Sequence, residues 1–162
     1  MVGRVEPLDG GFGWSFEDAQ PGLTIEHPVA RTIGRDEHVW LAMVSNNASD
    51  LHGNVEFARA TDFGEPVVLG ALTAAVIAGL AEPLEWPAAE AALGRSEGWI
   101  SIRLAAPVFG GDTLRAESAI LTVAAMPDGR GGVVRRRITG RNQHDEVVAT
   151  IDEERFVPAR GS

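Results

Sequence analysis

The sequence predicts an α+β fold in which helices come first and an antiparallel sheet comes last. Residues 68–80 form an apolar run rich in glycine and alanine, which is typical of a helix buried in a core. Residues 99–157 hold segments of alternating apolar and polar residues separated by tight turns, the pattern of consecutive antiparallel strands. Such a sheet needs cover on one face, and we expect the apolar helix to provide it.

Composition indicates one globular domain. The chain has 162 residues, of which 44% are hydrophobic and 23% are charged, as in ordinary soluble proteins. A formal net charge of −9 argues against binding to nucleic acid or to an anionic membrane. The absence of cysteine excludes disulfides, thiolate metal sites and a cysteine nucleophile. We expect a single domain over residues 1–162, with residues 1–15 as an irregular arm, and no bound metal.

The sequence carries no signal for export or membrane insertion. Residues 1–13 lack the apolar segment of a signal peptide. The longest nearly uncharged apolar run, residues 66–81, is shorter than the ~20 residues that cross a bilayer. We therefore expect a cytoplasmic protein without membrane contact.

The first half of the chain predicts one strand and two helices. Residues 23–32 alternate loosely and predict the strand. Residues 36–44 place apolar side chains at helical spacing after an acidic first turn, and we expect His38 on this helix to be solvated. A polar elbow, residues 45–52, ends this helix because Asn, Ser and Asp are turn formers. Residues 55–61 form a further short helix or turn before the apolar helix.

The second half predicts the other strands of a five-stranded sheet. Residues 99–104 alternate, and a Pro-Asp-Gly-Arg-Gly-Gly segment at residues 127–132 predicts a hairpin. Strands over residues 133–141 and 147–157 follow this hairpin. A long strand precedes the hairpin. The residues at its alternate positions lie on one face of the sheet, and they are Leu114, Ala116, Ser118, Ile120 and Thr122.

Three motifs follow one another along the chain. The elbow places Asn47 and His52 five residues apart, with Ala-Ser-Asp-Leu between them. A Pro-Val-Val-Leu-Gly-Ala-Leu segment at residues 66–72 opens the apolar helix and contains Gly70. A Pro-Val-Phe-Gly-Gly-Asp-Thr-Leu segment at residues 107–114 forms a turn between two strands.

Together these motifs resemble the MaoC-like acyl-CoA hydratase and dehydratase family. That family carries an Asp, an Asn-Pro pair and a His in the elbow, so Asn47 stands at the Asp place and His52 at the His place. In the second motif Leu69 stands where the family has a histidine, and the glycine after it is kept. Residues 46–47, 56–58 and 140–143 further resemble the branch of mesaconyl-CoA (β-methylmalyl-CoA) and itaconyl-CoA hydratases.

The resemblance implies a hot-dog fold, in which a five-stranded antiparallel sheet wraps around a central Gly/Ala-rich helix. It implies reversible hydration of a 2-enoyl-CoA thioester, here a branched dicarboxylic one such as mesaconyl-CoA or itaconyl-CoA. Coenzyme A is then part of the substrate, and no separate cofactor is implied. Because the edge of such a sheet favours pairing with a second copy, we expect a homodimer or a higher homo-oligomer.

The chemistry of hydration assigns roles to four residues. His52 is expected to take a proton from water and return it to the α-carbon. Backbone amides at the start of the apolar helix are expected to stabilise the thioester oxygen, with Gly70 presenting no Cβ to block its approach. Asn47 cannot act as a base, but its carbonyl oxygen can hold the water. Asp50 is a candidate accessory carboxylate. The structural alternatives are a turn residue for His52, a helix cap for Asn47 and a packing glycine for Gly70.

Arginines 135–137 are the candidate site for the phosphates of coenzyme A. Alternation along a strand places Arg136 on the opposite face from Arg135 and Arg137, and we name the latter two as substrate-binding residues. A solvated sheet face is the alternative. The residue that would bind the distal carboxylate of a dicarboxylic substrate is undecided, and Arg31, Arg59 and Arg103 are the candidates.

Two other functions stay open. Hot-dog acyl-CoA thioesterases typically place a carboxylate at or near the central helix, and residues 72–80 contain no Asp or Glu, which counts against that activity. A non-catalytic acyl-CoA-binding or interface module is the second alternative. It is favoured by the departures from the family pattern, which are Asn47, Ser49, Asp50, Gly53 and Leu69.

Overall fold

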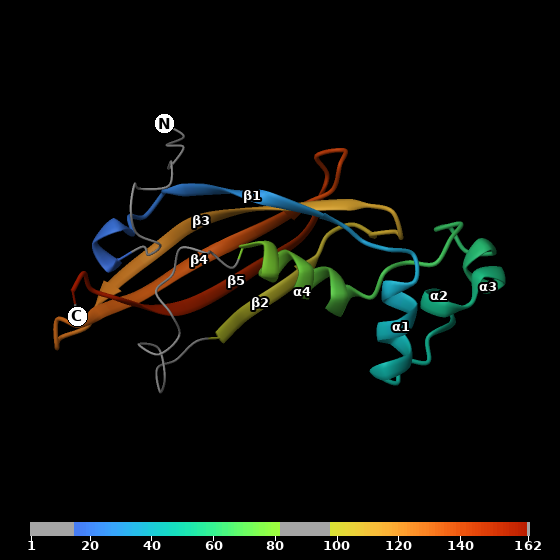
Figure 1. The fold of residues 1–162 in the computed structure, drawn as a ribbon, viewed down its shortest axis with the longest axis horizontal. Coiled ribbons are helices and arrows are strands. Elements are labelled where there is room, and N and C mark those ends of the chain that lie inside the picture. The colour runs from blue at the N-terminus through green and yellow to red at the C-terminus, as the bar shows by residue number, and fades with distance from the viewer. Residues whose placement is uncertain (1–14, 82–97, 162) are drawn as a thin grey trace.

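The computed structural model describes residues 15–81 and 98–161, which form one antiparallel sheet with a single helix along one face (Figure 1). The sheet has five strands in the order β1-β3-β4-β5-β2, so β1 and β2 are its edges. All four strand pairs are antiparallel. The strands are β1 (Thr24–Thr32), β2 (Gly98–Leu104), β3 (Thr113–Ala125), β4 (Gly131–Arg141) and β5 (Val147–Pro158).

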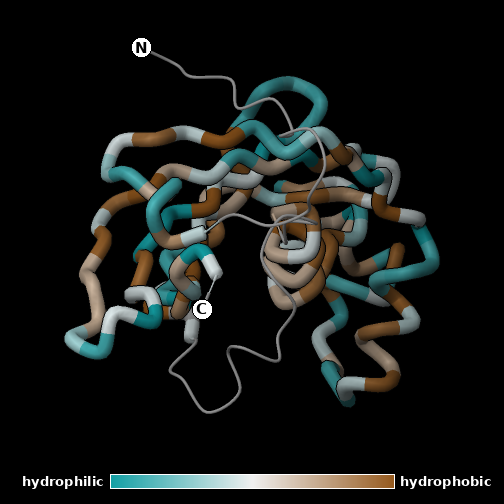
Figure 2. Tube along the Cα trace, turned by 60° about the vertical axis from the view of Figure 1, so that its left-hand side comes forward, coloured by the Kyte–Doolittle hydropathy of each residue, from teal (hydrophilic) through white to brown (hydrophobic). Residues whose placement is uncertain are grey.

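The helix against the sheet is α4 (Gly70–Ala81), and it is buried along most of its length. Figure 2 shows its apolar segment enclosed by the arch of the sheet. The approach is close at Gly140, where an added Cβ would meet the side chain of Ile77. Small residues on α4 and a glycine on β4 therefore let the sheet curve tightly around the helix. The predicted apolar helix and its place against the sheet are confirmed.

A buried ion pair fixes the C-terminal end of α4. Arg136 and Glu153 stand opposite each other on β4 and β5, and Arg136 Nε donates to Glu153 Oε1 at 2.6 Å. Arg136 Nη1 also donates to the carbonyl oxygen of Ala81 at 3.0 Å, at the end of α4. A cation suits the negative end of a helix dipole. This end of the helix is thereby attached to the middle of the sheet.

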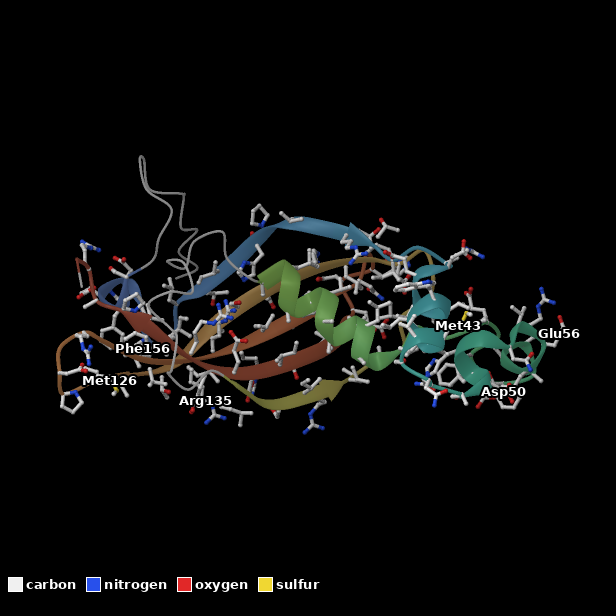
Figure 3. All side chains as sticks on the ribbon, turned by 60° about the horizontal axis from the view of Figure 1, so that its bottom comes forward. Met43, Asp50, Glu56, Met126, Arg135 and Phe156 are labelled. Atoms are coloured by element: carbon white, nitrogen blue, oxygen red, sulfur yellow. The ribbon has the colours of Figure 1, made fainter. Side chains whose placement is uncertain are left out.

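Three short helices form a helical tip at one end of the sheet: α1 (Glu37–Val44), α2 (Asp50–Gly53) and α3 (Val55–Arg59). In Figure 3, Met43 and Glu56 mark this tip, far from Met126 and Phe156 at the other end. The elbow is partly helical, because α2 makes a single turn where the sequence predicted only a turn.

The buried side of α1 differs from the prediction. His38 and Ala42 are its buried residues, whereas Trp40 and Met43 are 66% and 74% exposed. The expectation that His38 is solvated is therefore wrong, since it is only 3% exposed. The reason is that α1 meets the rest of the protein along the line through His38 and Ala42, and the larger apolar residues Trp40 and Met43 lie beside that line.

The predicted strands are confirmed with small shifts at their ends. The alternate face of β3 is buried from Leu114 to Ile120, and a register shift between Ile120 and Thr122 leaves Thr122 exposed. Most of the predicted arm and the connection between α4 and β2 lie outside the described residues. Among the described residues, no helix combines the length and apolar character that crossing a membrane requires.

The contact between Ile77 and Gly140 gives a first prediction. Gly140→Ala is expected to lower the free energy of unfolding by about 1–3 kcal/mol, because the new methyl group forces repacking. Ile77→Val removes Cδ1, the atom nearest to that methyl group, so the double variant should lose less than the sum of the single variants. Urea unfolding of the four proteins measures this.

Gly79→Ala is the matched control, because Gly79 lies on α4 with open space around its Cα and the change should not destabilise the protein. If the loss of unfolding free energy in the double variant equals the sum of the losses in the two single variants, the Ile77–Gly140 contact does not limit how closely α4 packs.

Candidate active site

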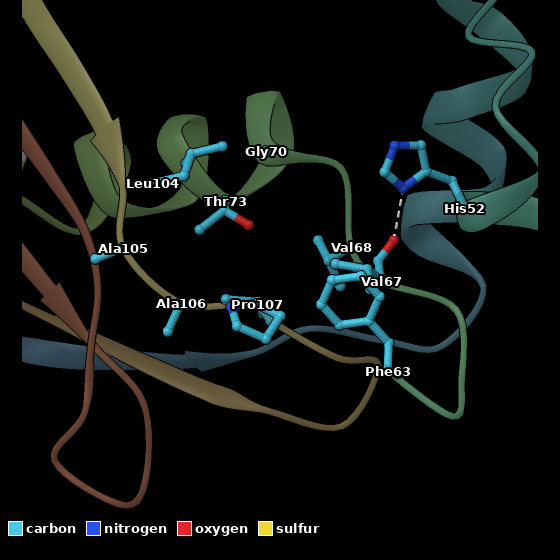
Figure 4. Close-up of a pocket in the computed structure, with 11 residues that line it drawn as sticks. His52, Phe63, Val67, Val68, Gly70, Thr73, Leu104, Ala105, Ala106 and Pro107 are labelled. Atoms are coloured by element: carbon cyan, nitrogen blue, oxygen red, sulfur yellow. Dashed lines mark hydrogen bonds between the residues drawn. The ribbon is translucent and has the colours of Figure 1, made fainter. Parts of the chain in front are cut away.

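A cavity of about 440 Å³ opens where α4 begins (Figure 4). It lies between the elbow and the segment that joins β2 to β3, residues 105–108. Most of its described lining is apolar, and the polar side chains in that lining are those of His52 and Thr73. The cavity therefore joins one titratable group to the start of a buried helix.

His52 is held in one orientation by the backbone. Its Nδ1 lies 2.8 Å from the carbonyl oxygen of Val67. A carbonyl oxygen can only accept, so Nδ1 carries the proton in the neutral ring and Nε2 keeps a lone pair. Figure 4 shows Nε2 on the side of the ring away from Val67. His52 is therefore arranged to accept a proton through Nε2.

Val67 is itself fixed by two neighbouring segments. Its N–H donates to the carbonyl oxygen of Leu51 at 3.2 Å, and it forms an isolated antiparallel bridge with Phe109. The next amide, that of Val68, donates to the carbonyl oxygen of Val108 at 2.8 Å. The elbow, the lead into α4 and the turn before β3 are thus tied together around His52.

The start of α4 offers free donors, and the first of them belongs to Gly70, a residue of the cavity wall. The first helical hydrogen bond joins the N–H of Thr73 to the carbonyl oxygen of Leu69 at 3.0 Å. In the described part of the chain, the amides of Gly70, Ala71 and Leu72 make no hydrogen bond. Free amides at a helix start, with the positive end of the dipole, stabilise negative charge. The structure therefore brings His52 and Gly70 to one pocket.

Asn47 and Asp50 are not brought there. Both are exposed, and neither is among the described residues of the cavity wall. The Oδ1 atom of Asn47 accepts from the N–H of Ser49 at 3.1 Å, and Asp50 Oδ1 accepts from Asn54 Nδ2 at 3.4 Å. Asn47 thus shapes the elbow locally, and its role in holding water stays a prediction.

Arg135 and Arg137 lie on the face of the sheet opposite α4. Arg137 donates twice to Asp152, at 2.7 and 2.9 Å, and Arg135 Nη2 lies 3.7 Å from the same carboxylate. Hydrogen bonds from Arg137 hold the pKa of Asp152 below its usual value. The prediction that Arg136 lies on the opposite face of the sheet from Arg135 and Arg137 is confirmed. Figure 3 shows Arg135 well away from Asp50, and neither arginine is among the described residues of the cavity wall, so the structure does not bring this pair to the pocket.

The three cations considered for a distal carboxylate also lie elsewhere. Arg31 pairs with Glu37, and Arg59 pairs with Glu56 at 2.7 Å. Arg103 is exposed on β2. The described wall of the cavity contains no Lys or Arg side chain, and the described residues contain no cluster of three or more His, Asp or Glu suited to a metal ion.

Sequence reasoning missed Thr73 and His38. Thr73 is the one polar residue in residues 68–80, which is a signal that was available. His38 is buried on α1, and its Nδ1 has no hydrogen-bond partner among the described residues. Burial lowers the pKa of His38, the positive charge that His52 can carry lowers it further, and Asp36 acts in the opposite direction. His38 is therefore a neutral neighbour of His52.

A family model described as MaoC like domain matches residues 17–142 of the chain. The chain belongs to the MaoC-like family. This confirms the resemblance that the three motifs indicated.

Two curated relatives share much of this MaoC-like sequence. It is 36% identical over 137 residues to mesaconyl-CoA hydratase of Cereibacter sphaeroides, covering 84% of this chain and 38% of that protein. It is 31% identical over 133 residues to beta-methylmalyl-CoA dehydratase of Chloroflexus aurantiacus, covering 82% and 37%. The MaoC-like chain thus spans less than two fifths of the length of either relative.

The fold is also that of a solved structure. A Mycobacterium tuberculosis protein, described as having a double hot-dog fold, superposes with a TM-score of 0.74 at 19% identity, over 93% of this chain and 46% of that one. The MaoC-like chain therefore has the expected hot-dog fold.

The buried state of His38 gives a prediction for stability against pH. Its pKa is lower in the folded protein than in the unfolded chain, where it is about 6.5. As the pH falls through about 6.5, the unfolded chain gains a proton that the folded protein does not, so folding stability falls. The loss ends below the folded-state pKa. We expect His38→Gln to remove this part of the pH dependence.

Urea unfolding at pH 7.5 and pH 5.5 tests this. The free energy of unfolding of wild type relative to His38→Gln should be lower at pH 5.5 than at pH 7.5. The same difference at both pH values would mean that His38 takes up its proton equally easily in both states.

Proposed function

We propose that this protein catalyses the reversible hydration of 2-enoyl-CoA thioesters. The observation that carries the proposal is one cavity lined both by His52, whose Nε2 keeps a lone pair, and by Gly70, whose amide makes no hydrogen bond in the described part of the chain. The names of the two curated relatives, a hydratase and a dehydratase of CoA thioesters, support it.

The residues act in two steps. Water attacks the β-carbon while Nε2 of His52 takes one of its protons, and the charge that leaves the double bond moves to the thioester oxygen. That oxygen accepts hydrogen bonds from the amides at Gly70. The enolate then takes the proton from His52 at the α-carbon, which gives the hydroxyacyl thioester. Dehydration runs through the same steps in reverse.

One histidine carries both proton transfers in this scheme. Asn47 occupies the family's Asp place and has no basic group. Its Oδ1 accepts from Ser49 and keeps a second lone pair for the water, but Asn47 is not among the described residues of the cavity wall, so this contact requires the elbow to rearrange. We give Asp50 only an accessory role, because its carboxylate is exposed and accepts a hydrogen bond from Asn54.

We propose a branched dicarboxylic acyl group, on the names of the relatives. The described wall offers this group an apolar surface and one hydroxyl, that of Thr73, which is buried and donates weakly to Leu69 at 3.4 Å. A distal carboxylate would therefore meet neutral donors on this wall. Thioester hydrolysis is less well supported, because α4 carries no carboxylate.

The test is loss of the enoyl-thioester absorbance after mixing with crotonyl-CoA, mesaconyl-CoA or itaconyl-CoA. Wild type should remove the band, and His52→Gln should lower kcat by about 10²–10⁴-fold, the usual contribution of a general acid–base group. His144→Gln is the matched control, because His144 is an exposed histidine in the β4–β5 turn.

Each other outcome has a meaning. An unchanged rate in His52→Gln would remove His52 from the mechanism. Release of free thiol without hydration would identify a thioesterase, and no reaction with any thioester would leave a binding module.

We further propose that two copies pair through β2. Within the described sheet, β2 pairs only with β5, so its outer backbone groups are open. Ile100 and Ile102 on this edge are 46% and 43% exposed. An apolar edge strand of this kind favours addition of a second strand. Leu104, the last residue of β2, also lines the cavity, so a partner on this edge would lie beside the site.

Ile102→Lys tests this pairing, because it places a charge on the edge strand. We expect the variant to sediment as a monomer in analytical ultracentrifugation while wild type sediments as a dimer or larger. Met43→Lys is the control, since Met43 is also apolar and exposed but lies on the helical tip. A monomer with Met43→Lys and a dimer with Ile102→Lys would move the interface to the tip.

A further inference from the structure

We propose that Leu104 determines which substituent the α-carbon of the acyl group can carry. This inference rests on the proposed hydratase function and names the part of the substrate that one side chain selects.

The observation is the position of Leu104 over Gly70. The three heavy atoms nearest to the place of a Gly70 Cβ all belong to the Leu104 side chain, with Cγ at 3.4 Å and Cδ2 at 3.6 Å. Both residues line the cavity, and Figure 4 shows the Leu104 side chain beside the start of α4. Leu104 therefore occupies the space where a side chain of residue 70 would lie, beside the helix start that is proposed to receive the thioester oxygen.

Covalent geometry then sets which substrate atoms meet Leu104. When the thioester oxygen approaches the amide at Gly70, the α-carbon lies one bond beyond the carbonyl carbon. In the s-trans conformer of the enoyl thioester, a substituent on the α-carbon lies on the same side as the thioester oxygen, so it is held next to this helix end. The wall beyond Leu104 consists of the small residues Ala105 and Ala106, so Leu104 supplies the bulk there.

The Leu104 side chain can limit the size of the α-substituent and still move aside for a small one. Leu104 is 54% exposed in the single chain, so among the described residues of that chain its isobutyl group has room to turn away from Gly70. A small α-substituent needs a small displacement, and a larger one needs the space that the isobutyl group holds. One methylene in an apolar pocket changes selectivity by about 10- to 200-fold.

The experiment compares kcat/KM for three thioesters that differ only at the α-carbon: crotonyl-CoA, 2-methylcrotonyl-CoA and 2-ethylcrotonyl-CoA. Wild type should accept the methyl compound and discriminate against the ethyl compound. In Leu104→Ala, the ratio of the ethyl to the methyl value should rise at least about tenfold. In Leu104→Phe, the ratio of the methyl value to the crotonyl value should fall.

Val29→Ala is the matched control. Val29 is a branched aliphatic residue, 52% exposed, on β1 at the other edge of the sheet, and it is not among the described residues of the cavity wall. Its selectivity ratios should equal those of wild type. Thermal unfolding of each variant confirms that the ratios come from folded protein.

The outcomes separate this inference from the proposed function. If wild type hydrates none of the three thioesters, the hydratase proposal fails for these substrates and takes the inference with it. If wild type hydrates crotonyl-CoA but neither Leu104 variant changes its ratios relative to Val29→Ala, the hydratase proposal stands and Leu104 is not the determinant.

Discussion

The close packing of α4 against the sheet is the constraint on which the rest of this protein depends. Ile77 fills the space that Gly140 leaves, so helix and sheet approach more closely than two side chains would allow. Because the sheet must curve to keep this contact, the buried residues of β3, β4 and β5 form one core cluster with those of α4. The start of α4, with its free amides, therefore has a fixed position relative to residues 105–108 and the elbow. The candidate site follows from the packing of the core.

The two ends of α4 have opposite electrostatic roles. At the C-terminal end, Arg136 binds the carbonyl oxygen of Ala81 and pairs with Glu153, both groups being almost fully buried. Burying an ion pair carries a desolvation penalty, so its contribution is better understood as fixing geometry than as adding stability. At the N-terminal end the amides are left without partners among the described residues, which leaves the positive end of the dipole available to a ligand. One helix thus serves as a structural anchor at one end and as a binding element at the other.

Periodicity predicted the elements, and three-dimensional context decided their faces. The run at residues 68–80 and the alternation of β3 were sufficient to predict the helix, the sheet and their contact. The buried face of α1 was not predictable, because Trp40, Met43 and Val44 are apolar but only the line through His38 and Ala42 meets the protein. Alternation also placed Arg136 correctly against its neighbours. It could not show that Asp152 and Glu153 meet these arginines, since that depends on the register between β4 and β5.

The same limit applies to the chemistry of His52. A carboxylate partner for a catalytic histidine leaves a visible residue in the sequence, and its absence at Asn47 marks a departure from the family. In this structure the ring is oriented by the backbone carbonyl of Val67, a group that every residue carries. Fixing His52 therefore requires only that Val67 be held, and the bonds to Leu51 and across to Phe109 hold it. With Asn47 at the family's Asp place, the tautomer of His52 is set without a carboxylate, by the main chain of three packed segments.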